Sequence, residues 1–200
     1  MSPITSTLAN SSAYGYRTFA AAAAPAFESI ATATPTSGTS ITFSSIPSTY
    51  QHLQIRMILR DTFTTFGADY ALALKFNGSS ANYTSHEING TGSAVAARGV
   101  TATSSMNLYA SGLWSGGTVP ASTFAATIID IHDYASTTKN KTVRYLAGAE
   151  YNSATGVNYG MVLGSGAWLD TSAISSFQIS GLAGTFDTGT TISLYGIKGA

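Results

Sequence analysis

The sequence predicts an all-β protein, a jelly-roll-like sandwich of two sheets with an extended N-terminal arm. From residue 27 onward, short segments rich in β-branched and aromatic residues alternate with clusters of Gly, Ser, Asn and Pro, which is typical of strands and turns. About ten such segments fall within 200 residues, and none has the apolar spacing of a helix. So many strands in one chain favour a sandwich or a barrel, and the long, irregular connections favour the sandwich.

The composition of the chain argues against several kinds of partner and site. Nine basic and nine acidic side chains cancel, so no net field attracts nucleic acid or an anionic membrane surface. The same neutrality removes the repulsion that keeps copies apart, which suits a protein that packs against neighbours. The chain has no Cys, which excludes disulfides and thiolate metal sites. No apolar run approaches the roughly 20 residues of a membrane helix.

Residues 1–26 are read as the N-terminal arm and residues 27–200 as the sandwich domain. The arm consists mainly of Ser, Thr and Ala, and Pro25 ends its alanine run. Such a segment has too few large apolar groups to fold alone, so any order must come from lying on a partner. Tyr14, Tyr16, Arg17 and Phe19 are the candidate anchors. A free tail is the alternative.

Ten strands are predicted in chain order. They are Phe27–Thr34, a strand around Ile41 and Phe43, QHLQIRMILR (51–60), YALALKF (70–76), SSMNLYA (104–110), TFAATIIDI (123–131), KTVRYLAGAEY (141–151), VNYGMVLGSGAW (157–168), AISSFQISGL (173–182) and TTISLYGIKG (190–199). The third alternates most strictly. It places Leu53, Ile55, Met57 and Leu59 on a core face and His52, Gln54, Arg56, Ile58 and Arg60 on a mostly solvated face.

Turn residues support several boundaries. Asn77-Gly78, Asn89-Gly90 and the stretch from Asp187 to Thr190 have the composition of tight turns. The stretch around Asn82 and Tyr83 is read as a loop ordered by side-chain to backbone bonds. The Gly-rich segment 111–122 carries Trp114, which either contacts a partner or folds back over the sandwich.

The segment IDIHDYASTTKNKTVRYL (129–146) concentrates charge in a chain that has little. Its charged residues are Asp130, Asp133, Lys139, Lys141 and Arg144. We interpret the segment as a hairpin in which the carboxylates end one strand and the cations begin the next. Such cross-strand pairs contribute about 0.2–1 kcal/mol each and help to set the register.

Catalysis and metal binding are the alternatives for this segment. Asp130 and His132 lie two apart and share a strand face, so the carboxylate could orient the imidazole. No recognisable nucleophile context accompanies them, and the spacing of His52, His86 and His132 matches no metal-ligand pattern. Asp130 with Asp133 would be the carboxylate pair of a polysaccharide hydrolase, yet the nearby cations explain both better. We therefore expect no enzyme activity, cofactor or metal.

Four stretches together resemble a family of virion structural proteins from tailed bacteriophages. They are FSSIPSTYQHLQIRMILR (43–60), LALKFNGSSANYTSHEING (72–90), IDIHDYASTTKNKTVRYLAG (129–148) and ISSFQISGLAGTFDTGTTISLYGIKG (174–199). The resemblance leaves the arm and residues 91–128 without support. It implies a β-sandwich component of the particle and neither catalytic residues nor a cofactor.

The leading hypothesis is therefore a capsid decoration, or cement, protein on the capsid surface of a virion assembled in the host cytoplasm. Its expected partners are the major capsid protein and neighbouring copies of itself, as a homo-oligomer for which a trimer is one option. The alternative is a tail or head-fibre module that binds a host-surface glycan, with Trp114, Tyr109, Tyr151 and Tyr159 as stacking groups.

Overall fold

The computed structural model of the chain describes residues 25–63, 71–90, 94–109, 113–114, 119–149, 160–181 and 184–199, the pair 113–114 by its backbone alone. This part of the chain contains thirteen strands and no helix, so the predicted all-β class is confirmed. Within it, no helix has the length and hydropathy needed to cross a membrane.

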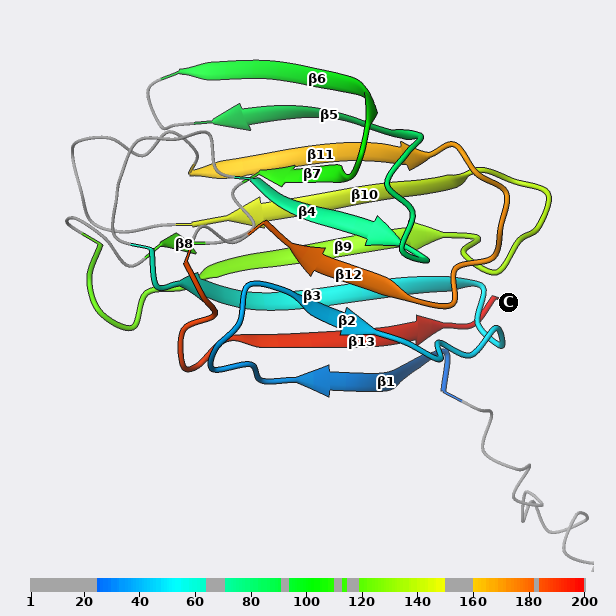
Figure 1. The fold of residues 1–200 in the computed structure, drawn as a ribbon, viewed down its shortest axis with the longest axis horizontal. Helices are drawn as coiled ribbons and strands as arrows, with labels where there is room; N and C mark the ends of the chain where they lie inside the picture. Colours follow the sequence, from blue (N-terminus) through cyan, green and yellow to red (C-terminus); the bar gives the residue numbers. More distant parts are fainter. Residues whose placement is uncertain are drawn as a thin grey trace, which may run out of the picture.

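Eight strands form the large sheet in the order β1-β13-β3-β9-β10-β11-β5-β6 (Figure 1). In that order their bounds are Phe27–Ala33, Thr191–Ile197, His52–Asp61, Ala125–His132, Lys141–Gly148, Met161–Trp168, Tyr83–Gly90 and Val95–Thr103. All neighbours in this order are antiparallel. The short strand β8 (Leu113–Trp114) runs parallel to the end of β3, outside this order.

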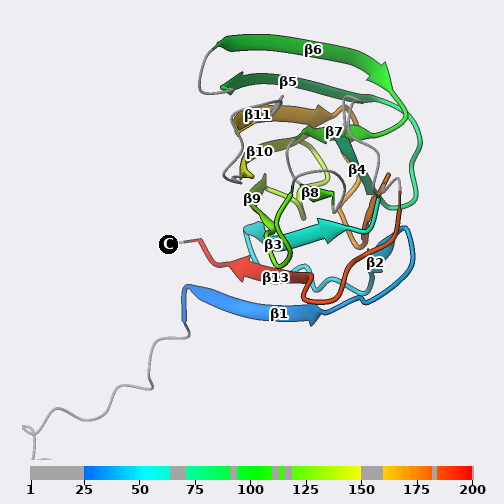
Figure 2. The same cartoon turned by 90° about the vertical axis from the view of Figure 1, so that its left-hand side faces the viewer.

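Four strands form the small sheet, in the order β2-β12-β4-β7. Their bounds are Ile41–Phe43, Phe177–Ser180, Ala71–Phe76 and Met106–Tyr109. Each lies in sequence between strands of the large sheet, so the chain passes repeatedly from one layer to the other. This crossing gives the sandwich its jelly-roll-like character, and Figure 2 shows the two layers from the side.

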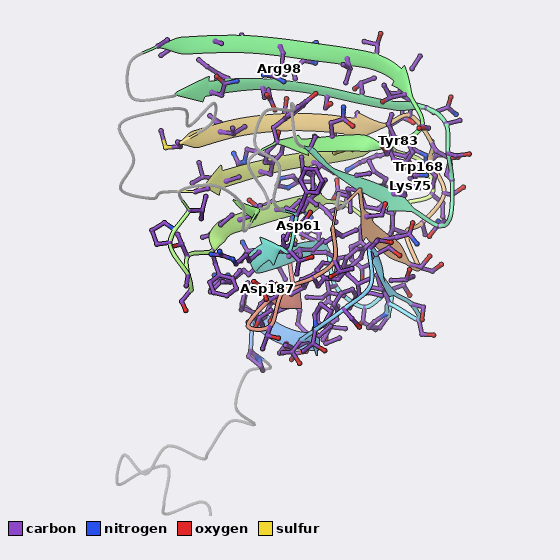
Figure 3. The ribbon with its side chains drawn as sticks, turned by 60° about the vertical axis from the view of Figure 1, so that its left-hand side comes forward. Asp61, Lys75, Tyr83, Arg98, Trp168 and Asp187 are labelled. Atoms are coloured by element: carbon purple, nitrogen blue, oxygen red, sulfur yellow. The ribbon has the colours of Figure 1, made fainter. Side chains whose placement is uncertain are left out.

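The core lies between the two sheets, where alternate residues of both layers meet. The predicted core face of β3 is confirmed, because Leu53, Ile55 and Leu59 are 0% exposed and Met57 is 2% exposed. Aromatic rings fill one end of the core. Three of them, Phe76, Tyr83 and Trp168, have ring centroids 5.8 to 6.2 Å apart, and Figure 3 shows Tyr83 beside Trp168.

Two predictions about turns meet different outcomes. Asn77 and Gly78 have φ angles of 51° and 69°, so the predicted turn after β4 is confirmed. The predicted turn at Asn89-Gly90 is wrong, because both residues continue β5, where they pair with Val162 and Met161. The loop expected around Tyr83 is likewise the start of β5, and β6 follows β5 as a second strand that was not predicted.

Arg60 corrects the prediction of a solvated face on β3. Its side chain is buried and donates from Nη1 to the carbonyls of Pro120 and Thr123, each at 2.8 Å. Its Nε lies 3.2 Å from the Asp187 carboxylate. Asp61 beside it accepts from the backbone N–H of Gly184 at 3.0 Å, and Figure 3 shows Asp61 and Asp187 at the same end of the sandwich. These two residues therefore fix two connections, β8–β9 and β12–β13, to the end of β3.

Candidate functional site

The outer face of the large sheet is the candidate functional site, because large apolar side chains lie exposed on it. On β3, β5, β9, β10 and β11 the buried and less buried residues alternate, so each strand has one core side and one outer side. On an antiparallel sheet that faces water, the outer side is normally polar. Here it carries isoleucine, leucine and methionine over several neighbouring strands.

Four of these side chains lie in register on adjacent strands and are called the apolar row: Ile128 of β9, Leu146 of β10, Leu163 of β11 and Ile88 of β5. Each pairs directly with the next across the ladders. Their exposed fractions are 40%, 48%, 51% and 48%. Single exposed apolar residues are common on protein surfaces, but a contiguous row marks an interaction surface.

A groove of about 550 Å³ runs beside the apolar row. Ile58 and Met161, which are 50% and 61% exposed, line it together with Ile128 and Leu146. Arg56 of β3 also lines the groove, which continues onto β13. The Arg56 guanidinium lies over the rings of its two aromatic neighbours, 5.3 Å from the centroid of Phe27 and 5.6 Å from that of Tyr195.

A polar row crosses the same strands two residues away from the apolar row. Its members are Gln54, Asp130, Arg144, Ser165 and His86, again in direct register. Gln54 donates to the Asp130 carboxylate at 2.8 Å, and Arg144 Nη2 lies 3.6 Å from it. The outer face therefore has an apolar half and a hydrogen-bonding half.

The charged hairpin joins β9 to β10, and two of the expected ion pairs are present. Arg144 is opposite Asp130, and Lys139 Nζ lies 2.7 Å from the Asp133 carboxylate. The hydrogen bond from Lys139 lowers the pKa of Asp133. These contacts hold the turn that connects two strands of the apolar row.

Lys141 does not form the ion pair expected of it. Its side chain is fully buried, and its ammonium donates to the carbonyls of Ser136, Lys139 and Thr171 at 2.7, 2.7 and 3.0 Å. Burial lowers the pKa of this ammonium. The reason for the difference is strand alternation: Lys141 is on the core side of β10, whereas Arg144 is on the outer side.

The geometry around His132 gives the catalytic alternative no support. Asp130 is engaged by Gln54 and Arg144, and the His132 ring packs edge-on against His52 with centroids 5.1 Å apart. His52 accepts the backbone N–H of Asp133 on Nδ1 at 3.0 Å. Over the described ranges, no group of three His, Asp or Glu side chains is placed to hold a metal ion.

A buried polar cluster lies directly behind the apolar row. Glu87 and Tyr145 precede Ile88 and Leu146 in sequence and therefore point into the sandwich. The Tyr145 hydroxyl donates to the Glu87 carboxylate at 2.8 Å, and Arg98 of β6 lies 3.0 Å from its other oxygen. Burial, reinforced by the carboxylate, raises the pKa of Tyr145.

Gly164 makes room for this cluster. It follows Leu163 on β11 and lies directly opposite Tyr145 in the β10–β11 ladder. A Cβ atom at this position would lie 2.0 Å from Tyr145 Cε1, so only glycine lets the ring lie flat across the strand. The residues behind the apolar row thus fix the register that places the row on the outer face.

Several predicted contact residues lie outside the part that the structure describes. These are the arm residues Tyr14, Tyr16, Arg17 and Phe19, together with Tyr151, Tyr159 and the side chain of Trp114. Tyr109 is described and lies within the predicted strand 104–110. It lies in β7, is only partly exposed, and has the Arg98 guanidinium over its ring at 4.4 Å.

Sequence reasoning did not identify the apolar row, although a signal was present. Three predicted strands contain two large apolar residues in succession, Ile128-Ile129, Tyr145-Leu146 and Val162-Leu163. Adjacent residues of a strand point to opposite faces, so each pair puts an apolar group on both sides of the sheet. That pattern predicts a strand that is covered on both faces.

Comparisons with known protein families, with curated proteins and with solved structures found no match. The resemblance to bacteriophage virion proteins therefore stays a prediction.

Proposed function

We propose that this chain is a virion structural protein, a capsid decoration protein that binds the shell of major capsid protein through the outer face of its large sheet. The observation that carries the proposal is the apolar row, four half-exposed side chains in register on adjacent strands. Covering a face of this kind with another protein lowers the free energy, because apolar surface is removed from water.

The size of the gain fits a specific but modest contact. About half of each side chain in the row is already covered, so burying the rest contributes roughly 1 kcal/mol per residue. Ile58, Met161 and the groove between them extend the apolar area. The polar row beside it supplies hydrogen-bonding groups that orient a partner.

Two further features support a structural role. The two-layer core with its buried aromatic rings provides a rigid body, which a shell-bound protein needs to resist mechanical load. The absence of net charge allows dense packing of copies without long-range repulsion. In this proposal the arm, with Tyr14, Tyr16, Arg17 and Phe19, makes a second contact with the shell.

The test is binding to purified capsid shells that lack this protein. Leu146→Lys places a charge in the middle of the apolar row, and we expect it to reduce shell binding at least tenfold in a co-sedimentation assay. Gln178→Lys is the matched control, because Gln178 occupies the corresponding outer side of the small sheet. Equal binding by both variants would contradict the proposal.

Abundance in the particle separates this function from the fibre alternative. A decoration protein is present in many copies, whereas a tail or fibre component is present in few. Quantitative mass spectrometry of purified virions measures the ratio of this chain to the major capsid protein. A ratio typical of a tail component would overturn the proposed location on the shell.

A further inference from the structure

Strand β6 forms an unusually open edge of the large sheet. Within the described residues it pairs with β5 alone. The other three edges are short or irregular: β2 has 3 residues, β7 has 4, and β1 shifts register between Ser29 and Ala31. By contrast, β6 has 9 residues, and its own register shift lies beyond Val100, so Val95 to Val100 form an uninterrupted ladder with β5. A long regular edge presents a row of N–H and C=O groups to another strand.

The usual protection of such an edge is missing from this segment. Its sequence, VAARGV, contains neither Pro nor Lys, and its one charge is Arg98. The Arg98 side chain turns to the inner face, where it pairs with Glu87 and covers the ring of Tyr109. Figure 3 shows Arg98 at this end of the sandwich. The guanidinium therefore does not shield the edge.

The strand also extends beyond the small sheet. The edge strand of the small sheet, β7, packs opposite β11 and β5, and in Figure 2 β6 lies past it. As a result, Val95 is 73% exposed, and both Ala96 on the inner side and Ala97 on the outer side are exposed. A strand that is open at its edge and on both faces is built to continue into further structure.

We propose that β6 pairs with β6 of a second copy of this chain, antiparallel, about a two-fold axis that passes through Ala97 perpendicular to the sheet. Self-pairing satisfies both open edges with one contact, because a two-fold interface uses the same surface twice. A chain without net charge opposes this approach with no long-range repulsion.

Side-chain chemistry selects the position of the axis. In an antiparallel pair, directly opposed residues have their side chains on the same face of the sheet. A two-fold axis perpendicular to the sheet must therefore pass between one residue and the same residue of the other copy. Centring on Arg98 would place two guanidinium groups directly opposite, which is destabilising. Centring on Ala97 instead places Arg98 opposite Ala96, and Val95 opposite Gly99. At Gly99 the His86 ring of the same copy fills the place of a side chain, so Val95 would pack against that ring.

The pairing would join two eight-stranded sheets into one continuous sheet. Ala97 lies in register with Ile88, so the apolar row leads directly to the two-fold axis. Two rows would then form one apolar band across the dimer. The dimer would form in the isolated protein, so a measurement of dimerisation tests this proposal separately from binding to a capsid.

Single-cysteine cross-linking tests the position of the axis, because the natural chain has no Cys. Under mild oxidation Ala97→Cys should give a disulfide-linked dimer at least tenfold faster than Ala96→Cys. Opposed residues of an antiparallel pair lie within disulfide distance, whereas Ala96 lies diagonally from its own copy. Thr32→Cys, on the edge strand β1, is the control for random collision. If Ala97→Cys cross-links no faster than this control, the proposal is wrong.

A charge-swap experiment tests the symmetry without a covalent bond. Ala97→Lys and Ala97→Glu should each raise the dimer dissociation constant at least tenfold in sedimentation equilibrium, because like charges face each other. An equimolar mixture of the two variants should regain the dimer, and circular dichroism should show both variants folded. A monomeric natural chain at high micromolar concentration, or a mixture that remains monomeric, would overturn the inference.

Discussion

The two sheets turn chemically different faces to the outside. The outer side of the small sheet carries Thr42, Gln178 and Lys75 in one row and Ser180, Ala73 and Asn107 in the next. The outer side of the large sheet carries the apolar row in the same kind of position. The small sheet follows the usual pattern for a solvated antiparallel sheet, and the large sheet departs from it. The proposed function accounts for this departure, because it has a partner covering the large sheet.

The difference between the faces depends on the register of β5, β10 and β11. A slip of one residue would turn the apolar row into the core and the buried polar cluster outward. Glu87, Tyr145 and Gly164 oppose that slip from behind the row. Substitutions of these buried groups should therefore have the largest effects, and substitutions on the surface the smallest.

Glu87→Ala should lower the free energy of unfolding by about 3 kcal/mol, because it removes the carboxylate that pairs with the partly buried Arg98 and with the buried Tyr145 hydroxyl. Urea denaturation at neutral pH measures the change. Glu87→Gln is the control, since its amide oxygen can still accept from Tyr145, and its loss should be clearly smaller. Equal losses for the two variants would show that the hydrogen bond to Tyr145 does not contribute.

Alkaline pH should loosen the same cluster. Burial raises the pKa of Tyr145, and also of Tyr83 and Tyr134, above the ordinary tyrosine value of 10.0. Above about pH 10 the unfolded chain loses tyrosine protons that the folded chain keeps, so stability falls as the pH rises. The lowered pKa of Lys141 acts in the opposite direction below the ordinary lysine value of 10.5. It is one group against four tyrosines, because the hydrogen bond to Glu28 also raises the pKa of Tyr50.

The measurement is the urea midpoint at pH 8 and at pH 11. Tyr145→Phe removes the most strongly perturbed hydroxyl, so its midpoint should fall less over this interval than that of the natural chain. An identical fall in both would contradict the assignment of this effect to Tyr145.

Surface substitutions should change adhesion with little effect on stability. Leu163→Lys and Thr42→Lys both exchange an outer-face residue, so each should alter the free energy of unfolding by no more than about 0.5 kcal/mol. Only Leu163→Lys should reduce the binding of a fluorescent hydrophobic dye, because only it interrupts the apolar row. Equal dye binding by the two variants would mean that the outer faces do not differ as adhesive surfaces.

The alternation in the sequence was sufficient for much of the fold. It located β3 and its core residues, and the charged hairpin between β9 and β10 was correctly placed around the pairing of Asp130 with Arg144. Local signals work there because each residue's side follows from the strand period alone. The candidate site was harder to predict, since exposure of Leu146 or Leu163 depends on which elements cover the sheet.

Strand β5 was hard to predict for the same reason, because the burial of its residues depends on strands that are distant in sequence. Glu87 and Asn89 are core-side residues of β5, yet they read as turn or surface residues in sequence. The carboxylate of Glu87 is acceptable inside because Tyr145 and Arg98, one of them distant in sequence, supply partners for it. Asn89-Gly90 likewise has turn composition, but pairing with β11 keeps it extended.

By itself, the sequence determined the β class, most of the strands, the neutral charge balance and two of the hairpin ion pairs, because these follow from composition and from contacts between neighbours in the chain. Tertiary structure alone decided which strands became edges, which sheet face remained uncovered, and where the buried charges found partners. Those features depend on long-range pairing, and a residue's burial is fixed only when strands far apart in the sequence meet.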